Sequence, residues 1–173
     1  MVPGIIARGR NICSFIRIGD NRLRRSRAPW FILSNLLLTY VVTVLAALIW
    51  MPFEEVPSDA GPTFPDGGWV YELVFVCVIG PLLETLIFQW GIIRLMQSSG
   101  WFATWVMVLV SAVFFGASHW YDMSYVFFAT CLGLVLAYAF VSCDGTSKNA
   151  YWCVVAIHAL RNLATFILLL STR

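Results

Sequence analysis

The chain has 173 residues, of which 60% are hydrophobic and 12% are charged, and its formal net charge is +2. Soluble domains are roughly 45–50% apolar and 25% charged, so this composition excludes an ordinary soluble protein, and it also excludes a disordered or disulfide-rich one. It indicates a membrane protein whose length allows four to six helical spans.

Residues 1–28 form a basic arm ahead of the first apolar run. The arm contains seven arginines: Arg8, Arg10, Arg17, Arg22, Arg24, Arg25 and Arg27. Lys and Arg beside a span stay on the cytoplasmic side, so the N-terminus is predicted to be cytoplasmic. We expect the arm to contact anionic lipid headgroups rather than nucleic acid. The five cysteines have no metal-ligand or disulfide-like spacing, which favours buried or interfacial thiols.

Five apolar stretches follow the arm, and each is close to the length that a bilayer requires. They cover residues 29–51, 69–96, 101–119, 124–141 and 151–170. The loop after the first stretch holds four acidic residues and no Lys or Arg, which is typical of a non-cytoplasmic loop. The sequence therefore predicts one all-α membrane bundle of about five helices over residues 29–173, with the C-terminus outside.

The second stretch contains Gly80-Pro81 near its middle. Proline lacks a backbone N–H, so we expect a kink or a break there, and two short helices are an alternative to one span. Glu84 follows Pro81 by three positions. It is therefore predicted to lie in the first turn of a restarted helix, where a carboxylate is favoured.

Ionisable side chains within spans are costly and usually functional. Such residues here are Glu84, His119, His158 and Arg161, with the polar Asn162 beside them. His158 and Asn162 are four residues apart, so they share one helix face. The ordinary interpretation of each residue alone is a polar group satisfied by a neighbouring helix. Their concentration in so short a chain favours a common site.

Phe115 and His119 are also four residues apart, and Gly116, Ala117 and Ser118 lie between them. Such small residues allow another helix to approach closely. Counting about 1.5 Å per residue places His119 near the outer end of its span and His158 nearer the inner end. For the two to meet, helices must tilt or the span boundaries must shift.

Three motifs, PLLETLIFQWG, FGASH and HALRN, follow one another along the chain. They resemble the signature of the CAAX-protease and bacteriocin-processing family of glutamic intramembrane proteases: a Glu-Glu-x-x-x-Arg helix, a Phe-x-x-x-His helix and a His-x-x-x-Asn helix. The resemblance covers about residues 81–165. By position, Glu84, His119, His158 and Asn162 match family residues, and Phe115 begins the second motif.

The resemblance implies that Glu84 and His119 activate a water molecule for attack on a peptide carbonyl. It implies that His158 and Asn162 stabilise the resulting oxyanion. No metal and no other cofactor is expected. Elementary chemistry agrees with these roles, since a carboxylate and an imidazole suit general acid–base work and preset donors suit a developing negative charge.

The sequence departs from the family pattern at two positions. Thr85 stands where the second glutamate is expected, and Gln89 stands where the arginine is expected. The two family charges are four residues apart and can pair, so their joint loss leaves a neutral pair that is still able to hydrogen bond, a conservative exchange of a supporting contact. Arg161 has two open interpretations: it supplies the charge that Gln89 lacks, or it pairs with a carboxylate or carbonyl elsewhere.

The leading hypothesis is an endopeptidase that cuts in or near the C-terminal tail of a membrane-anchored substrate. The chain resembles compact bacterial members of the family, some of which are proposed to process sorting tails, so a bacterial inner membrane is expected. The partners expected are the substrate and the lipid bilayer, with no nucleic acid. The alternatives are a non-catalytic immunity or scaffold protein of the same fold and, less favoured, a His₂Glu zinc protease. The lack of repeats argues against a transporter.

Overall fold

The computed structural model describes residues 21–53, 68–143 and 148–172 of the chain. The basic arm up to residue 20, the acidic loop 54–67 and the turn at 144–147 lie outside the described residues, and so do the predictions that fall on them. The chain divides into two compact units, Met1–Phe31 and Ile32–Arg173. The described part of the first unit is the start of helix α2. All of the candidate site residues belong to the second.

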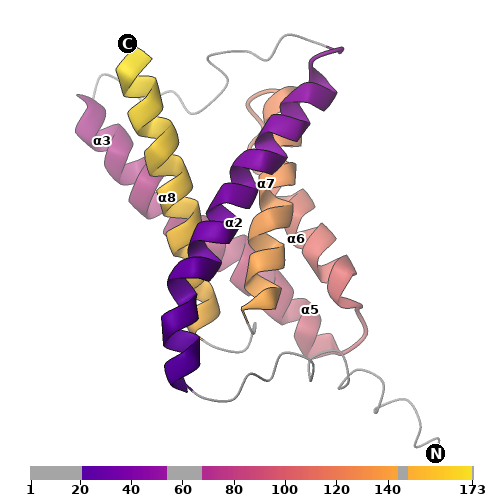
Figure 1. Ribbon diagram of the computed structural model, residues 1–173. Coiled ribbons are helices and arrows are strands. Elements are labelled where there is room, and N and C mark those ends of the chain that lie inside the picture. Colours follow the sequence, from indigo (N-terminus) through magenta and orange to yellow (C-terminus); the bar gives the residue numbers. More distant parts are fainter. Residues whose placement is uncertain (1–20, 54–67, 144–147, 173) are drawn as a thin grey trace, which may run out of the picture. The chain divides into compact units, whose positions relative to one another are not determined.

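The described residues form helices and no strands, which confirms the predicted all-α class (Figure 1). In chain order they are α2 (Asn21–Trp50), α3 (Gly68–Val74), η2 (Phe75–Ile79), α4 (Gly80–Glu84), η3 (Thr85–Ile92), α5 (Ile93–Ser99), α6 (Thr104–Ala117), α7 (Met123–Ser142) and α8 (Lys148–Thr172). Helix α8 begins at Lys148, three residues before the apolar stretch predicted over residues 151–170.

Four of the described helical stretches are long and apolar enough to cross a membrane: Ala28–Trp50, Gly68–Ser99, Met123–Ser142 and Ala150–Ser171. Large apolar side chains cover their outer surfaces, as in a bundle whose solvent is lipid. Trp101 and Trp120, which flank helix α6, are largely exposed and fit an interfacial belt. The chain is therefore a polytopic membrane bundle.

Helix α6 is shorter than the predicted span. It has 14 residues, which is roughly 21 Å of helix against about 30 Å of hydrocarbon. It ends at Ala117, so His119 lies in the turn that follows rather than on the helix. A helix this short does not carry that turn across the full bilayer. The difference in membrane depth between His119 and His158 is therefore smaller than the predicted spans imply.

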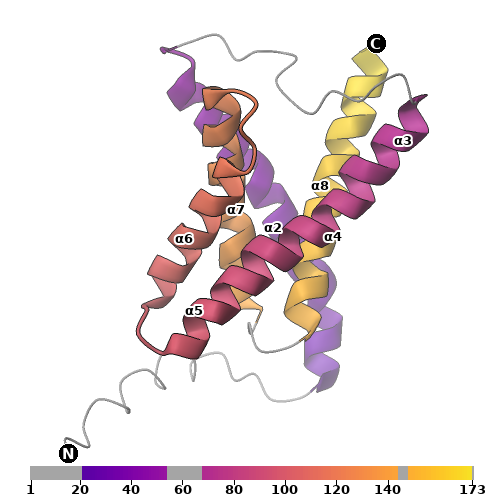
Figure 2. The same cartoon turned by 180° about the vertical axis from the view of Figure 1, so that it is seen from behind.

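A break at Gly80-Pro81 and the alternative of two short helices are both wrong. Residues Gly68–Ser99 form one uninterrupted helical stretch, and Figure 2 shows it running continuously from α3 to α5. Two wide π-helical segments, η2 and η3, lie on either side of Pro81, and the backbone N–H of Gly80 bonds to the carbonyl of Phe75, five residues back. Such bulges absorb the missing proline N–H. Glu84 therefore lies in mid-helix and not in a first turn.

Close packing joins α6 to α7. A Cβ atom on Gly116 would overlap the Thr130 side chain and would lie 2.9 Å from the Thr130 backbone nitrogen. A Cβ on Gly133 would lie 3.1 Å from Cα of Ala112. The prediction that the small residue before His119 permits close helix approach is confirmed at Gly116, which is buried, whereas Ala117 is exposed.

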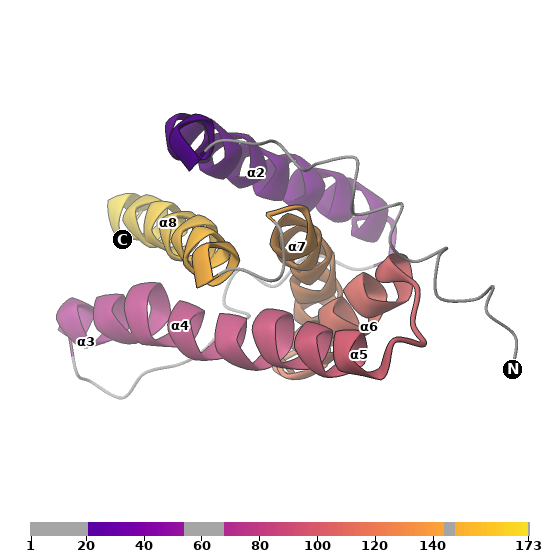
Figure 3. The same cartoon turned by 90° about the horizontal axis from the view of Figure 1, so that it is seen from below.

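Helix α8 packs against the long helix, which is the continuous stretch Gly68–Ser99. It packs along η2, α4 and η3 and also contacts α7. Figure 3 shows α8 lying between that long helix and residues 32–50 of α2. On the α2 side, the Tyr40 hydroxyl donates a hydrogen bond to the Arg161 carbonyl at 3.2 Å. His158 and its neighbours are thus held within the protein rather than facing lipid.

Candidate active site

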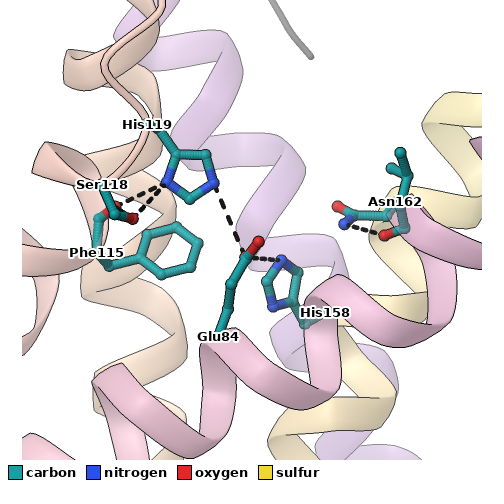
Figure 4. A network of polar contacts seen from close by, with 7 residues as sticks. Glu84, Phe115, Ser118, His119, His158 and Asn162 are labelled. Carbon is teal, nitrogen blue, oxygen red and sulfur yellow. Dashed lines mark hydrogen bonds and ion pairs between the residues drawn. The ribbon is translucent and has the colours of Figure 1, made fainter. Parts of the chain in front are cut away.

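Three polar side chains, two from helices and one from the turn after α6, meet at one carboxylate oxygen. Oε2 of Glu84, at the end of α4, lies 3.8 Å from Nε2 of His119 and 3.5 Å from Nε2 of His158 (Figure 4). The Glu84 side chain is 30% exposed, the His119 side chain 16% and the His158 side chain 2%. The site is therefore partly open at Glu84 and closed behind His158.

The His119 ring is oriented by the end of α6. Its Nδ1 lies 2.7 Å from the Phe115 carbonyl and 3.1 Å from the Ser118 hydroxyl. A carbonyl oxygen only accepts, so Nδ1 must carry the hydrogen. Ser118 itself donates to the same carbonyl at 2.7 Å. In the neutral ring Nε2 is then the basic nitrogen, and it is the one that faces Glu84.

Phe115 separates and supports the two histidines. Its ring centroid lies 4.7 Å from that of His119 and 5.6 Å from that of His158, and it meets Phe88 edge-to-face at 5.7 Å. Phe115 is almost completely buried. Beneath the site, a Cβ on Gly80 would come within 3.4 Å of Glu84 Oε1, so the carboxylate lies directly over this glycine. Phe115 thus packs against both histidines, and Gly80 leaves space for the Glu84 carboxylate.

Asn162 lies one turn beyond His158 on α8, as the spacing predicts, but its contact is different. The side-chain amide donates to the Val76 carbonyl at 2.9 Å, and Figure 4 shows the nitrogen turned toward that oxygen. Val76 belongs to η2, the wide segment where the regular backbone bonding is disturbed. Asn162 therefore joins α8 to the helix that carries Glu84, and it retains a second amide hydrogen.

Thr85 and Gln89, which are able to hydrogen bond to each other, do not do so among the described residues. Both side chains are completely buried, and neither the Thr85 hydroxyl nor the Gln89 amide has a hydrogen-bond partner among the described residues. The wide turns of η3 change the register of the two positions from that of a regular α-helix. They fill the interior behind Glu84 rather than forming a polar pair.

Arg161 points toward α2. Its Nη2 donates to the Thr43 hydroxyl at 3.2 Å, and the guanidinium carbon lies 5.8 Å from the centroid of the Tyr40 ring. It forms no ion pair with a carboxylate in the part of the chain that the structure describes. The sequence left two interpretations of Arg161 open: a charge that replaces the one missing at Gln89, or a pair with a carboxylate or carbonyl. Neither describes the observed partners of the guanidinium, which are a hydroxyl and an aromatic face.

Two tyrosines that the sequence did not single out line the His119 side of the site. The Tyr125 ring stacks on His119 with centroids 5.8 Å apart, and Tyr121 meets Tyr125 edge-to-face at 5.2 Å. Tyr125 is held by the first turn of α7, which Asp122 caps. The only signal for them in the sequence is the short Trp-Tyr-Asp corner that follows His119.

The Asp122 cap fixes the turn that holds His119. Its Oδ1 accepts hydrogen bonds from the Ser124 hydroxyl at 2.5 Å and the Ser124 backbone N–H at 2.7 Å. These bonds hold the pKa of the Asp122 carboxyl below its usual value, because they favour the charged form. The hydrogen bonds that begin α7 are therefore made by Asp122 and Ser124 and involve none of the candidate site residues.

Metal-ligand geometry is a separate question. Over residues 21–53, 68–143 and 148–172, no three His, Cys, Asp or Glu side chains are arranged to hold a metal ion. None of the described cysteines, which are Cys77, Cys131, Cys143 and Cys153, forms a disulfide bond. The polar groups at the site are those of general acid–base and hydrogen-bond chemistry.

Comparison with known proteins gives one family. The model of the family described as type II CAAX prenyl endopeptidase Rce1-like matches residues 66–164, which is more than half of the chain. The matched segment begins before α3 and ends within α8, so it includes Glu84, His119, His158 and Asn162. Searches of curated proteins and of solved structures find no match.

Proposed function

Because the chain belongs to the Rce1-like family of type II CAAX prenyl endopeptidases, we propose that it is a glutamic intramembrane endopeptidase. The observation that carries the proposal is the contact of both histidines with one oxygen of Glu84. These are the only histidines in the chain, and they come from separate helical regions. A carboxylate between two imidazoles in an otherwise apolar bundle has few structural uses and an evident chemical one.

The proposed reaction begins with a water molecule between Glu84 and His119. Hydrogen bonds to water are about 2.8 Å long, so a single oxygen can lie within bonding distance of two atoms 3.8 Å apart. Glu84 removes a proton from this water as it attacks the scissile carbonyl. Glu84 then gives this proton to Nε2 of His119, whose Nδ1–H is directed at Phe115, and Nε2 passes it to the leaving amine as the peptide C–N bond breaks, which returns both groups to their starting states.

The proposed oxyanion donor is His158. Its Nε2 lies on the Glu84 side, and a hydrogen on that nitrogen is placed to meet the negative charge that develops on the carbonyl oxygen. Asn162 donates to Val76, so its first role in this proposal is to hold α8 against η2. Its second amide hydrogen is available to the oxyanion. Removing one such donor costs about 3–4 kcal/mol in well-studied hydrolases.

The proposed substrate is a peptide bond in or near the C-terminal tail of a membrane-anchored protein. The site lies among helices with apolar outer surfaces, so a substrate that shares the bilayer reaches it without leaving the membrane. We place the protein in the inner membrane of a bacterium, where processing of C-terminal sorting tails is the corresponding role. Membrane anchoring also raises the local concentration of substrate near the site.

The test is co-expression with candidate tailed substrates, read by mass spectrometry. The native chain should shorten a substrate, and Glu84→Gln should leave it intact. Glu72→Gln is the matched control, because Glu72 is a second carboxylate on the same long helix. Equal shortening with native and Glu84→Gln chains contradicts the proposal, and so does equal loss of activity in both variants.

A second candidate function is a non-catalytic immunity or scaffold protein of the same fold. It is favoured by the neutral Thr85 and Gln89, whose buried polar atoms lack partners in the described structure. Glu84→Gln distinguishes the two functions, since a scaffold would keep its phenotype when the carboxylate becomes an amide of the same shape.

A further inference from the structure

Three buried side chains in the interior beside Glu84 hold polar atoms that have no hydrogen-bond partner among the described residues. These atoms are Oγ1 of Thr85, Oε1 and Nε2 of Gln89, and Nδ1 of His158. Thr85 and Gln89 are completely buried, and His158 is 2% exposed. Buried polar atoms are nearly always hydrogen-bonded to protein or to ordered water, because an unpaired one is costly. We therefore expect a bound partner for these four atoms.

The Thr85 hydroxyl differs from three other threonine hydroxyls in the helices. Thr39, Thr43 and Thr130 each donate to a carbonyl of their own helix, at 2.6, 2.8 and 2.8 Å. Such a bond satisfies the hydroxyl within the helix that carries it. The Thr85 hydroxyl makes no bond of this kind, so its hydrogen remains for an acceptor outside its own helix.

The three side chains belong to one packed interface. Thr85 and Gln89 are the buried residues of η3, and η3 packs against α8, the helix that carries His158. Glu84 directly precedes Thr85, and its Oε2 lies 3.5 Å from Nε2 of His158. Figure 4 shows Nδ1 on the edge of the His158 ring that faces away from the carboxylate. The unpaired nitrogen is thus directed into the interior that also holds the Thr85 and Gln89 side chains.

The contact with Glu84 sets the hydrogen-bonding role of Nδ1. An ionised carboxylate only accepts hydrogen bonds, so Nε2 of a neutral His158 ring carries the hydrogen when it faces Glu84. The other nitrogen of a neutral imidazole is then an acceptor. Nδ1 of His158 therefore requires a donor, and no group in the described part of the chain supplies one.

A water molecule has the donors and acceptors that these side chains require. Buried waters typically make about three hydrogen bonds to polar groups that the protein leaves unsatisfied. One water can donate to Nδ1 of His158 and to Oε1 of Gln89 while it accepts from the Thr85 hydroxyl. The three residues thus supply as many partners as a buried water usually has.

We propose that Thr85, Gln89 and His158 bind one buried water molecule, and that this water donates to Nδ1 of His158. Thr85 and Gln89 are then positioning residues, which act on the reaction through His158. The inference rests on the proposed function, in which Nε2–H of His158 meets the oxyanion. When Glu84 takes up a proton it no longer holds the hydrogen on Nε2. The water at Nδ1 keeps it there, because the bond at one ring nitrogen sets the state of the other.

The experiment is magic-angle-spinning NMR of the full chain in lipid bilayers, with ¹⁵N in the histidine rings. The chain contains only two histidines, so the signals that persist in His119→Gln belong to His158. The native chain should show an unprotonated Nδ1 that receives magnetisation from water protons, although the ring is buried. Thr85→Val combined with Gln89→Met removes the other partners of the water at similar side-chain size. This double variant should lose the transfer, and each single variant should reduce it.

Ser111→Ala is the matched control, because it removes a completely buried hydroxyl that already has a protein partner. The Ser111 hydroxyl donates to the Phe88 carbonyl at 3.0 Å. The variant should keep the transfer from water to Nδ1 of His158. A native chain without this transfer would overturn the inference, and so would a transfer that persists unchanged in the double variant.

The melting temperature of the double variant gives a second readout with opposite signs. Without a bound water, exchanging unpaired polar atoms for apolar groups of the same size should raise the melting temperature. With the water, Nδ1 of His158 loses its donor, so the melting temperature should fall. A rise would therefore overturn the inference.

Kinetics separate the water site from the proposed function. On a membrane-anchored peptide, the double variant should lose about 10–100-fold in kcat with little change in KM, because the position of His158 and not substrate binding is altered. Transfer from water to Nδ1 in a native chain that cuts nothing would keep the water site and contradict the proposed function. Cleavage by a native chain without this transfer would do the reverse.

Discussion

Replacing Gly116 by alanine should displace His119 from Glu84. The added Cβ would lie 2.9 Å from both the Thr130 nitrogen and the Thr130 Cβ, whereas ordinary contacts begin at 3.4 Å. The Thr130 hydroxyl is held by the Val126 carbonyl at 2.8 Å, so it cannot rotate away without losing that bond. Even after the Thr130 hydroxyl gives up that bond and rotates away, helices α6 and α7 must separate by roughly 0.5 Å to clear the Thr130 nitrogen and Cβ, and overpacking of this kind costs about 1–3 kcal/mol.

The same separation should reduce catalysis. His119 follows Gly116 by three residues, and its Nε2 already lies 3.8 Å from Glu84 Oε2. A misplacement of 1 Å at a reacting group can cost about 100-fold in rate, so 0.5 Å should cost about tenfold in kcat/KM. Thermal unfolding followed by tryptophan fluorescence measures the first effect, and cleavage of a membrane-anchored peptide measures the second.

The control for this prediction is Ala117→Val, which adds bulk to the next residue on an exposed face. It should leave both measurements near the native values. Combining Gly116→Ala with Thr130→Gly should recover part of the stability, because the Thr130 side chain is removed from the contact. A Gly116→Ala chain with native stability and rate would refute the packing argument, and so would an equal effect from Ala117→Val.

Three further predictions concern the turn after α6 and the chemistry. Asp122→Ala should lower the melting temperature. Because folding lowers the pKa of Asp122, the stability that its ionised carboxyl contributes is complete above the ordinary pKa near 3.9 and is lost as the pH falls through the lowered pKa of the folded chain. The native and Asp122→Ala chains should therefore melt at the same temperature in strong acid. Tyr125→Ala should lower kcat/KM by up to about 100-fold through loss of the stack on His119, whereas Tyr125→Phe should be close to native, and equal losses would contradict this. Proteolysis should survive strong chelators; a loss that added zinc restores would establish the metal alternative.

The fold and much of the site follow from features that a sequence carries directly. Apolar length alone defines the spans, and motif spacing selects Glu84, His119 and His158, which the structure places in contact. The relation of His158 to Asn162 is also a simple consequence of helical periodicity. These are local properties, so no knowledge of the packed bundle is needed to see them.

What the sequence does not predict depends on packing between distant segments. Pro81 is accommodated by π-helical turns on both sides, a backbone arrangement that the period of the apolar residues does not indicate. Gln89 and Thr85 lie in a shifted register because of the same turns. Asn162 takes the Val76 carbonyl that such a turn leaves free, and Tyr125 reaches His119 only because α7 folds back on α6.

The most direct test of a single shared hydrolytic site is a double-mutant cycle between Glu84 and His119, read as kcat/KM on a membrane-anchored peptide. If the two groups act on one water molecule, Glu84→Gln and His119→Gln should each lower the rate by about 10²–10⁴-fold, and the double variant should be no slower than the worse single one. Independent, multiplying effects would contradict the shared site, as would a variant that cleaves at the native rate.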